Sequence, residues 1–287
     1  MTASPSTTGP APGLAPLEWF AVGVLAVVLA PGLLAMAAVW GTTDYLSHGF
    51  LIPLVSLWVW LRERPRRDAI APERAPLGSA WLGLALLVYA AGLLSNAMWL
   101  HGTALVAAVA CAVWWLRGPG WLRVAAFPLG YLLFMVPPPG SWTTPLIVRL
   151  QLWVSVVAVD ALNLLGEGVR REGNVMHLSN GQGLFVAEAC SGVTSVITLA
   201  PLGVLLAYLA LGRSWSRACL IASVVPLAMV GNLARVILTA MLAARYGARV
   251  AAEGPPHLLL GLVTYVVGVG LLIGFAFLLR RAEPPAA

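Results

Sequence analysis

The feature that most constrains this chain is a series of apolar segments, each about 20 residues long, that recurs from one end of the sequence to the other. A helix of that length crosses the ~30 Å hydrocarbon core of a bilayer. Hydrophobic residues make up 60% of the chain and charged residues only 10%, whereas soluble domains carry about 25% charged residues. The sequence therefore predicts an all-α, polytopic helical membrane protein.

The apolar pattern predicts about eight transmembrane helices and one further helix that does not cross. The expected spans are residues 17–40, 49–62, 77–95, 97–116, 121–138, 189–211, 217–244 and 257–279. A ninth apolar stretch, 143–165, contains Arg149 and Asp160, and we expect it to be an interfacial or re-entrant helix. The polar stretch 166–188 contains an Asn-Gly turn signal and predicts a small hairpin before Cys190.

Arginines in the connecting loops set the expected orientation, because short basic loops are retained on the cytoplasmic side. All basic residues are arginine, and eleven of them fall in four loops or ends: 62–74, 117–123, 213–217 and 280–281. One orientation places them all inside, with both termini cytoplasmic and residues 139–188 outside the plasma membrane of a prokaryote. We expect a disordered tail at 1–16, one membrane-embedded catalytic domain at 17–281 and a short tail at 282–287.

The composition also narrows the kinds of partner and cofactor. The net charge of +6 comes from arginines placed between apolar runs, which is typical of membrane orientation signals and not of nucleic-acid binding. Three cysteines are too few and too scattered for a disulfide framework. Neither CxxC nor HExxH occurs, so we expect no metal and no cofactor.

Several polar residues from different segments converge on the outer face in this topology. They are Asp44 and His48 in the first outer loop, Glu188, Cys190 and Ser191 at the start of span 189–211, Asn232 and Arg235 in span 217–244, and His257 at the start of the last span. Three other outcomes stay open at this stage: Arg235 as a snorkelling or ion-paired structural arginine, Cys190 as a buried apolar residue, and His257 as a helix-capping residue. His48 and His177 also compete for the role of His257.

Cys190, Arg235 and His257 together make a coherent chemical set. At a helix start, the positive dipole end and the backbone N–H groups lower a thiol pKa, and Glu188 and Ser191 make that site polar. The thiolate attacks an acyl carbon, the histidine moves a proton, and the arginine stabilises the oxyanion. Asn232 lies three residues before Arg235 on the same helical face and is expected to orient it.

At these residues the sequence resembles the exosortase/archaeosortase family of multipass membrane cysteine transpeptidases. The resemblance covers about residues 40–270 and rests on DYLSHGFLIP (44–53), FPLGYLLFMVPPPGSW (127–142), REGNVMHL with VAEACSGV (171–193), PLAMVGNLARVILTA (226–240) and GPPHLLLGLVTY (254–265). It implies a triad of Cys190, Arg235 and His257. The stretch GQGLFVAEACSG departs from the family pattern at Gln182 and Phe185, where a more acidic pattern is expected.

The resemblance also implies the substrate. It is a secreted protein that ends in a short motif such as Pro-Glu-Pro, one transmembrane helix and a basic cluster, as in systems that accompany exopolysaccharide production. The enzyme cleaves at the motif and passes the new C-terminus to an acceptor, whose identity the sequence does not give. Two alternatives are a membrane-surface cysteine protease that uses water, and a transporter or glycan-export partner whose arginine binds an anion. Many transporters are built from inverted repeats, and the sequence shows no convincing repeat.

Overall fold

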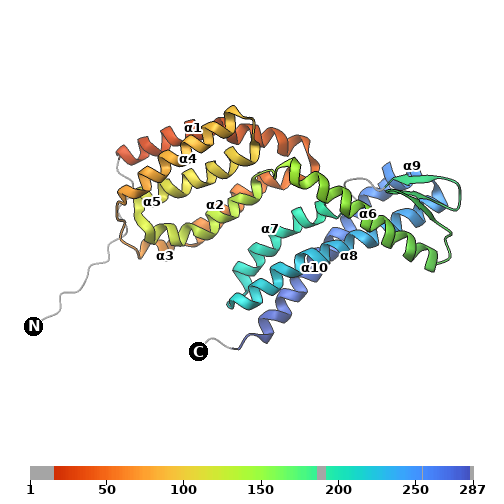
Figure 1. The fold of residues 1–287 in the computed structure, drawn as a ribbon. Helices are drawn as coiled ribbons and strands as arrows, with labels where there is room; N and C mark the ends of the chain where they lie inside the picture. The colour runs from red at the N-terminus through yellow and green to blue at the C-terminus, as the bar shows by residue number, and fades with distance from the viewer. Residues whose placement is uncertain (1–15, 186–191, 254, 285–287) are drawn as a thin grey trace, which may run out of the picture. The chain divides into compact units, whose positions relative to one another are not determined.

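A computed structural model describes residues 16–185, 192–253 and 255–284 of the chain. These residues are mostly helical, as Figure 1 shows, with one small sheet. The elements are α1 (Pro16–Thr42), η1 (Asp44–Phe50), α2 (Leu51–Arg62), α3 (Arg64–Asp68), α4 (Pro76–Leu94), α5 (Met98–Tyr131), η2 (Leu132–Met135), α6 (Gly140–Leu164), β1 (Arg170–Glu172), β2 (Val175–His177), β3 (Gly183–Phe185), α7 (Val193–Ala210), α8 (Ser214–Tyr246), α9 (Ala248–Glu253) and α10 (Pro255–Ala282).

Seven of the described helices are long and apolar enough to cross a membrane. These candidate spans are Glu18–Thr42, Pro76–Leu94, Met98–Met135, Gly140–Leu164, Val193–Ala210, Ser214–Tyr246 and Leu258–Ala282. The predicted class, a polytopic helical membrane protein with a small hairpin, is confirmed. The chain divides into two compact units, Met1–Pro139 and Gly140–Ala287, which we call the first and second units. A single catalytic domain over 17–281 stays a prediction.

One expected span is shorter in the structure than the sequence predicted, and two others are separate segments under one helix label. The span expected at 49–62 is α2, a helix of 12 residues that is about 18 Å long and so shorter than the hydrocarbon core. The spans expected at 97–116 and 121–138 are the two helical segments of α5, which a break at Gly118 separates. The stretch 143–165 lies in α6, which has the length and apolarity of a crossing helix, so its interfacial placement stays a prediction.

The break inside α5 explains why the sequence predicted two spans there. Gly118 has φ 86° and ψ 177°, a conformation that essentially only glycine adopts. A Cβ at this position would lie 2.6 Å from the carbonyl oxygen of Glu73. The backbone N–H groups of Glu73 and Ala75 donate to the carbonyls of Arg117 and Trp115, at 3.2 and 3.1 Å. The α3–α4 loop thus satisfies carbonyl groups that the break leaves without helical partners.

A second irregularity in the first unit is repaired by Tyr89 of α4. Pro31 lies inside α1 and removes one backbone donor. The N–H of Gly32 donates to the Tyr89 hydroxyl at 2.8 Å, and that hydroxyl donates to the carbonyl of Leu29 at 3.1 Å. Tyr89 is buried. A buried hydroxyl therefore keeps the disturbed turn of α1 hydrogen-bonded where no water is at hand.

The second unit is built around α8, which α7 and α10 contact along its first part (Figure 1). Two apolar clusters lie on this helix. One joins α7, α8 and α10 and includes Leu199, Val224 and Leu272. The other joins α6, the sheet and the later part of α8, and includes Leu162, Met176, Leu178, Val236, Ala240 and Ala243. Asn232 and Arg235 lie on α8 between Ala228 of the first cluster and Val236 of the second.

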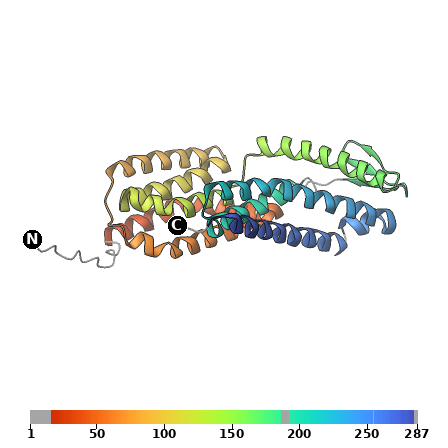
Figure 2. The ribbon, with the colours of Figure 1, turned by 90° about the horizontal axis from the view of Figure 1, so that it is seen from below.

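The predicted hairpin is present and gains a third strand. β1 pairs with β2 and β2 with β3, all antiparallel, next to α6 and α9 (Figure 2). Asn180, in the turn before β3, donates to the carbonyls of Ala243 and Ala244 at 3.1 Å. Gln182 accepts a 2.6 Å hydrogen bond from the N–H of Ala248, at the start of α9. The two amides therefore hold the sheet against the end of α8 and the start of α9.

Candidate functional site

Asn232 and Arg235 form the polar segment of α8. Asn232 is buried and Arg235 is half-buried. A spacing of three residues places them on one helical face, as the sequence predicted. Both lie inside a candidate span, where a charged residue costs at least about 2.5–3.5 kcal/mol on insertion scales and usually marks function.

The start of α7 contacts this segment. Gly192, the residue before α7, has φ 85°, a left-handed conformation that favours glycine. A Cβ there would lie 2.8 Å from Sδ of Met229 and 3.4 Å from Nδ2 of Asn232. The backbone two residues after Cys190 thus runs directly over Asn232. The helix begins at Val193, a few residues later than expected, and its positive dipole end lies at Gly192.

Helix α10 approaches the same segment from another direction through a glycine. A Cβ on Gly261 would lie 3.2 Å from both Cζ and Nη2 of Arg235. The guanidinium group therefore packs against the backbone of α10. His257 is four residues before Gly261, one turn away on the same face of that helix. Proline at positions 255 and 256 is favoured in a first helical turn.

We call the set Gly192, Asn232, Arg235 and Gly261 the three-helix junction. It brings α7, α8 and α10 together within the second unit. Of the predicted triad, the structure describes the side chain of Arg235. Glu188, Cys190 and Ser191 lie outside the described residues, and so does the side chain of His257. Their roles stay predictions, but the described neighbours of Cys190 and His257 both meet the arginine segment.

Asp44 and His48 belong to η1 of the first unit. The ring nitrogen Nδ1 of His48 lies 3.0 Å from the carbonyl oxygen of Tyr45, so it donates when protonated. Burial lowers the pKa of His48 below 6.5, although hydrogen bonds to the carbonyls of Tyr45 and Phe134 oppose that shift. The neutral ring is thus the favoured form. The side chain of Asp44 lies outside the described part of the chain.

Two further histidines have separate surroundings. His177 on β2 is exposed and lies 3.4 Å from a carboxylate oxygen of Glu172, so the sheet gives it a partner of its own. His101 is 3% exposed, between Gly92 of α4 and Tyr89. The close approach of α4 to α5 at Gly92 buries it.

The sequence alone did not identify Gly261 of the junction or the anchoring role of Asn180 and Gln182. Gln182 stood out only as a departure from an acidic pattern, and the structure gives it the hydrogen bond to Ala248. Within residues 16–185, 192–253 and 255–284, no three His, Cys, Asp or Glu side chains are grouped as metal ligands.

A family model described as transmembrane exosortase (Exosortase_EpsH) matches residues 40–274. The match includes the positions of the predicted triad and those of all four junction residues. It agrees with the resemblance found in the sequence over about residues 40–270. No curated protein and no solved structure matches the chain.

Proposed function

Because this chain belongs to the transmembrane exosortase family, we propose that it is a protein-sorting cysteine transpeptidase that cleaves C-terminal sorting signals of secreted proteins. The observation that supports the proposal most is the three-helix junction. Arg235 lies against α10 one turn after His257, and Asn232 lies under the backbone two residues after Cys190. Three segments far apart in the sequence therefore meet beside Arg235, and two of them continue directly to Cys190 and to His257.

The proposed reaction has two acyl-transfer steps. His257 takes the proton of Cys190, and the thiolate attacks the carbonyl carbon at the sorting motif. Arg235 stabilises the oxyanion of the tetrahedral intermediate. His257 then protonates the leaving amine, the C–N bond breaks, and a thioester to Cys190 remains. An acceptor nucleophile attacks the thioester, the C–S bond breaks, and the thiol is regenerated.

Nearby polar residues have supporting roles in this proposal. Asn232 orients Arg235 or a substrate carbonyl, and Ser191 lets the chain turn closely beside Cys190. Glu188 pairs with Arg235 or His257, or binds a basic part of the substrate. Asp44 and His48 line the outer face of the first unit. Loop arginines support an extracytoplasmic site with both termini inside, since short basic loops stay cytoplasmic.

The direct test is removal of the sulfur. We expect Cys190→Ala to abolish processing of a co-produced substrate that carries a motif, a transmembrane helix and a basic cluster, while the protein still inserts in the membrane. Cys219→Ala is the matched control, since Cys219 is a half-buried cysteine of α8, and it should process normally. Normal processing by Cys190→Ala would contradict the proposal.

Mass spectrometry of the product separates transfer from hydrolysis. An adduct on the new C-terminus supports transfer to an acceptor, whereas a free carboxylate shows that water is the acceptor. Both outcomes keep Cys190 as nucleophile, so this experiment tests the second step alone.

A further inference from the structure

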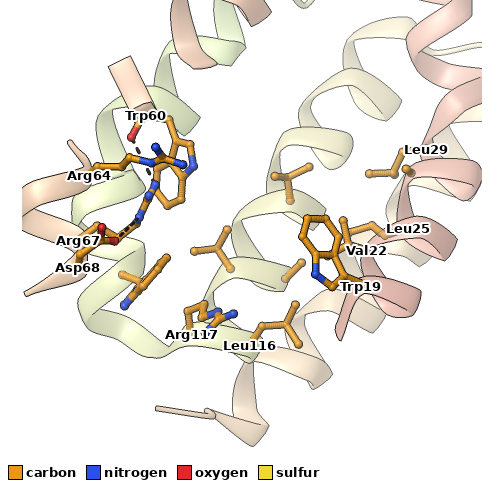
Figure 3. Close-up of a pocket in the computed structure, with 15 residues that line it drawn as sticks. Trp19, Val22, Leu25, Leu29, Trp60, Arg64, Arg67, Asp68, Leu116 and Arg117 are labelled. Atoms are coloured by element: carbon orange, nitrogen blue, oxygen red, sulfur yellow. Dashed lines mark hydrogen bonds and ion pairs between the residues drawn. The ribbon is translucent and has the colours of Figure 1, made fainter. Parts of the chain in front are cut away.

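The first unit contains a cavity of about 730 Å³ that lies outside the three-helix junction. Figure 3 shows one wall with Trp60, Arg64 and Arg67 and the opposite wall with residues of α1. The lining residues are Trp19, Val22, Leu25, Ala26 and Leu29 of α1, Trp60, Arg64, Arg67 and Asp68 of α2 and α3, and Val109, Ala112, Val113, Leu116, Arg117 and Trp121 of α5.

The inner surface of the cavity is an apolar channel made by two helices. Val22, Leu25, Ala26 and Leu29 follow the spacing i, i+3, i+4, i+7 on α1. The same spacing recurs on α5, with Val109, Ala112, Val113 and Leu116. Such a spacing presents one continuous helical face. Seven residues of helix extend about 10 Å, so the channel gives an extended hydrocarbon chain apolar contact on two sides.

One end of the channel is cationic. Three arginines and a single aspartate line the cavity there. Arg64 is exposed and has no carboxylate partner among the described residues. Arg117 pairs with Glu18 at 3.4 Å, and Glu18 also pairs with Arg74 at 3.3 Å. The end of the cavity therefore keeps an excess of positive charge after its ion pairs are counted.

Arg67 is held rigidly at this end. Its side chain is 9% exposed, and its Cζ lies 4.3 Å from the ring centroid of Trp60 and 5.1 Å from that of Trp121. It donates to the Trp60 carbonyl and to the Asp68 carboxylate, both at 3.4 Å. A guanidinium has five N–H donors, so two long hydrogen bonds leave much of its donor capacity for a ligand in the cavity.

Three tryptophans indicate that this end of the cavity lies at the depth of the lipid headgroups. Trp19, Trp60 and Trp121 all line the cavity beside the arginines, and tryptophan is enriched at the level of the lipid headgroups. The five arginines of 62–74 and Arg117 fall on the side expected to be cytoplasmic. Basic pockets between membrane helices on that side bind anionic headgroups.

We propose that this cavity binds an anionic phospholipid, with its phosphate at Arg64, Arg67 and Arg117 and an acyl chain along α1 and α5. A soluble anion alone would leave the apolar channel unused, and a basic peptide segment would be repelled by the arginines. The site is independent of the transpeptidase chemistry. The lipid adds contacts between α1 and α5, which also contact each other directly.

Native mass spectrometry of the full-length protein in detergent tests the charge. Phosphatidylglycerol is titrated in parallel with phosphatidylcholine, and phosphatidylglycerol should bind more tightly. One arginine near a headgroup contributes enough that Arg64→Gln should weaken phosphatidylglycerol binding about fivefold. Arg66→Gln is the matched control, since Arg66 is on the same short helix, 76% exposed, paired with Glu63 and outside the cavity. Equal loss in both variants, or equal binding of the two lipids, would overturn the proposal.

A second pair of variants tests the apolar channel. Ala26→Phe fills the channel without changing charge and should abolish tight binding of phosphatidylglycerol. Val27→Phe adds the same ring to a position that is 74% exposed and outside the cavity, and it should bind normally. Unchanged lipid binding in Ala26→Phe, together with competition by millimolar inorganic phosphate, would show a soluble-anion site and contradict the lipid assignment.

Discussion

Both units place arginines away from water, but they surround them differently. In the first unit, Arg67 lies over the rings of Trp60 and Trp121, and Arg117 is paired with Glu18. In the second unit, Arg235 lies against the backbone of Gly261 and one helical turn from Asn232. Aromatic rings and a carboxylate contact the first two guanidinium groups at the edge of a cavity, whereas the third contacts a helix backbone at a glycine.

The difference separates two arginines fixed at the edge of a cavity from one placed at the three-helix junction. A guanidinium over two indole rings gains cation–π energy and is held in place. At Gly261 the absence of a side chain lets the guanidinium of Arg235 pack directly against the backbone of α10. The position of this arginine therefore depends on the glycine.

The largest expected effect is at Arg235. We expect Arg235→Gln to lower the rate of substrate processing by about 10²–10³, since loss of one oxyanion donor has that effect in other enzymes. Arg235→Lys should also be poor, because lysine lacks the planar fork. Processing is measured by the ratio of cleaved to uncleaved substrate at matched protein levels. Full activity of the lysine variant would remove Arg235 from the mechanism.

A smaller effect is expected at Gly261. Gly261→Ala puts a Cβ 3.2 Å from the guanidinium of Arg235, which must move by a few tenths of an ångström. We expect about a tenfold slower processing, since small misplacements of catalytic groups are costly, and little change in Tm. Gly270→Ala is the matched control on α10, because nothing lies within 4 Å of its Cβ. Equal processing rates for Gly261→Ala and Gly270→Ala would show that Arg235 does not act on the reacting group.

The first unit should give the opposite result. Arg67→Lys keeps the charge but loses the flat stacking on Trp60 and Trp121, so the free energy of unfolding should fall by about 1–2 kcal/mol. Processing per folded molecule should not change. Thermal unfolding in detergent measures the first quantity, with Arg66→Lys as the exposed control. If Arg67→Lys lost processing without losing stability, Arg67 would act in the reaction, and the contrast between the two units would be wrong.

The smallest effect concerns pH. The pKa of His48 is lowered in the folded protein, first of all by burial. The neutral ring therefore stabilises the fold fully above pH 6.5, and the stability falls as the pH drops below that value because the unfolded chain takes up the proton more readily. We expect His48→Asn to flatten the dependence of Tm on pH between about 5 and 7. An unchanged slope would show that other groups cause it.

The sequence predicted most of the membrane architecture because insertion depends on a local sum of transfer free energies. That sum identified the apolar helices, and it failed where tertiary structure intervened. It did not predict that backbone groups of Glu73 and Ala75 cap the break at Gly118. Likewise α2 is too short to cross by itself. The Asn-Gly turn predicted the hairpin. The pairing of β1 with β2 could not be predicted from the residues of that turn.

For the candidate site, the sequence by itself determined which chemical groups are present and that Asn232 shares a helical face with Arg235. Only the tertiary structure decided that Gly192 covers Asn232 and that Gly261 lies against Arg235. Helical periodicity fixes neighbours three or four residues apart, since it follows from backbone geometry. Neighbours on other helices depend on which small residues let two backbones approach, and that is a property of the packed unit.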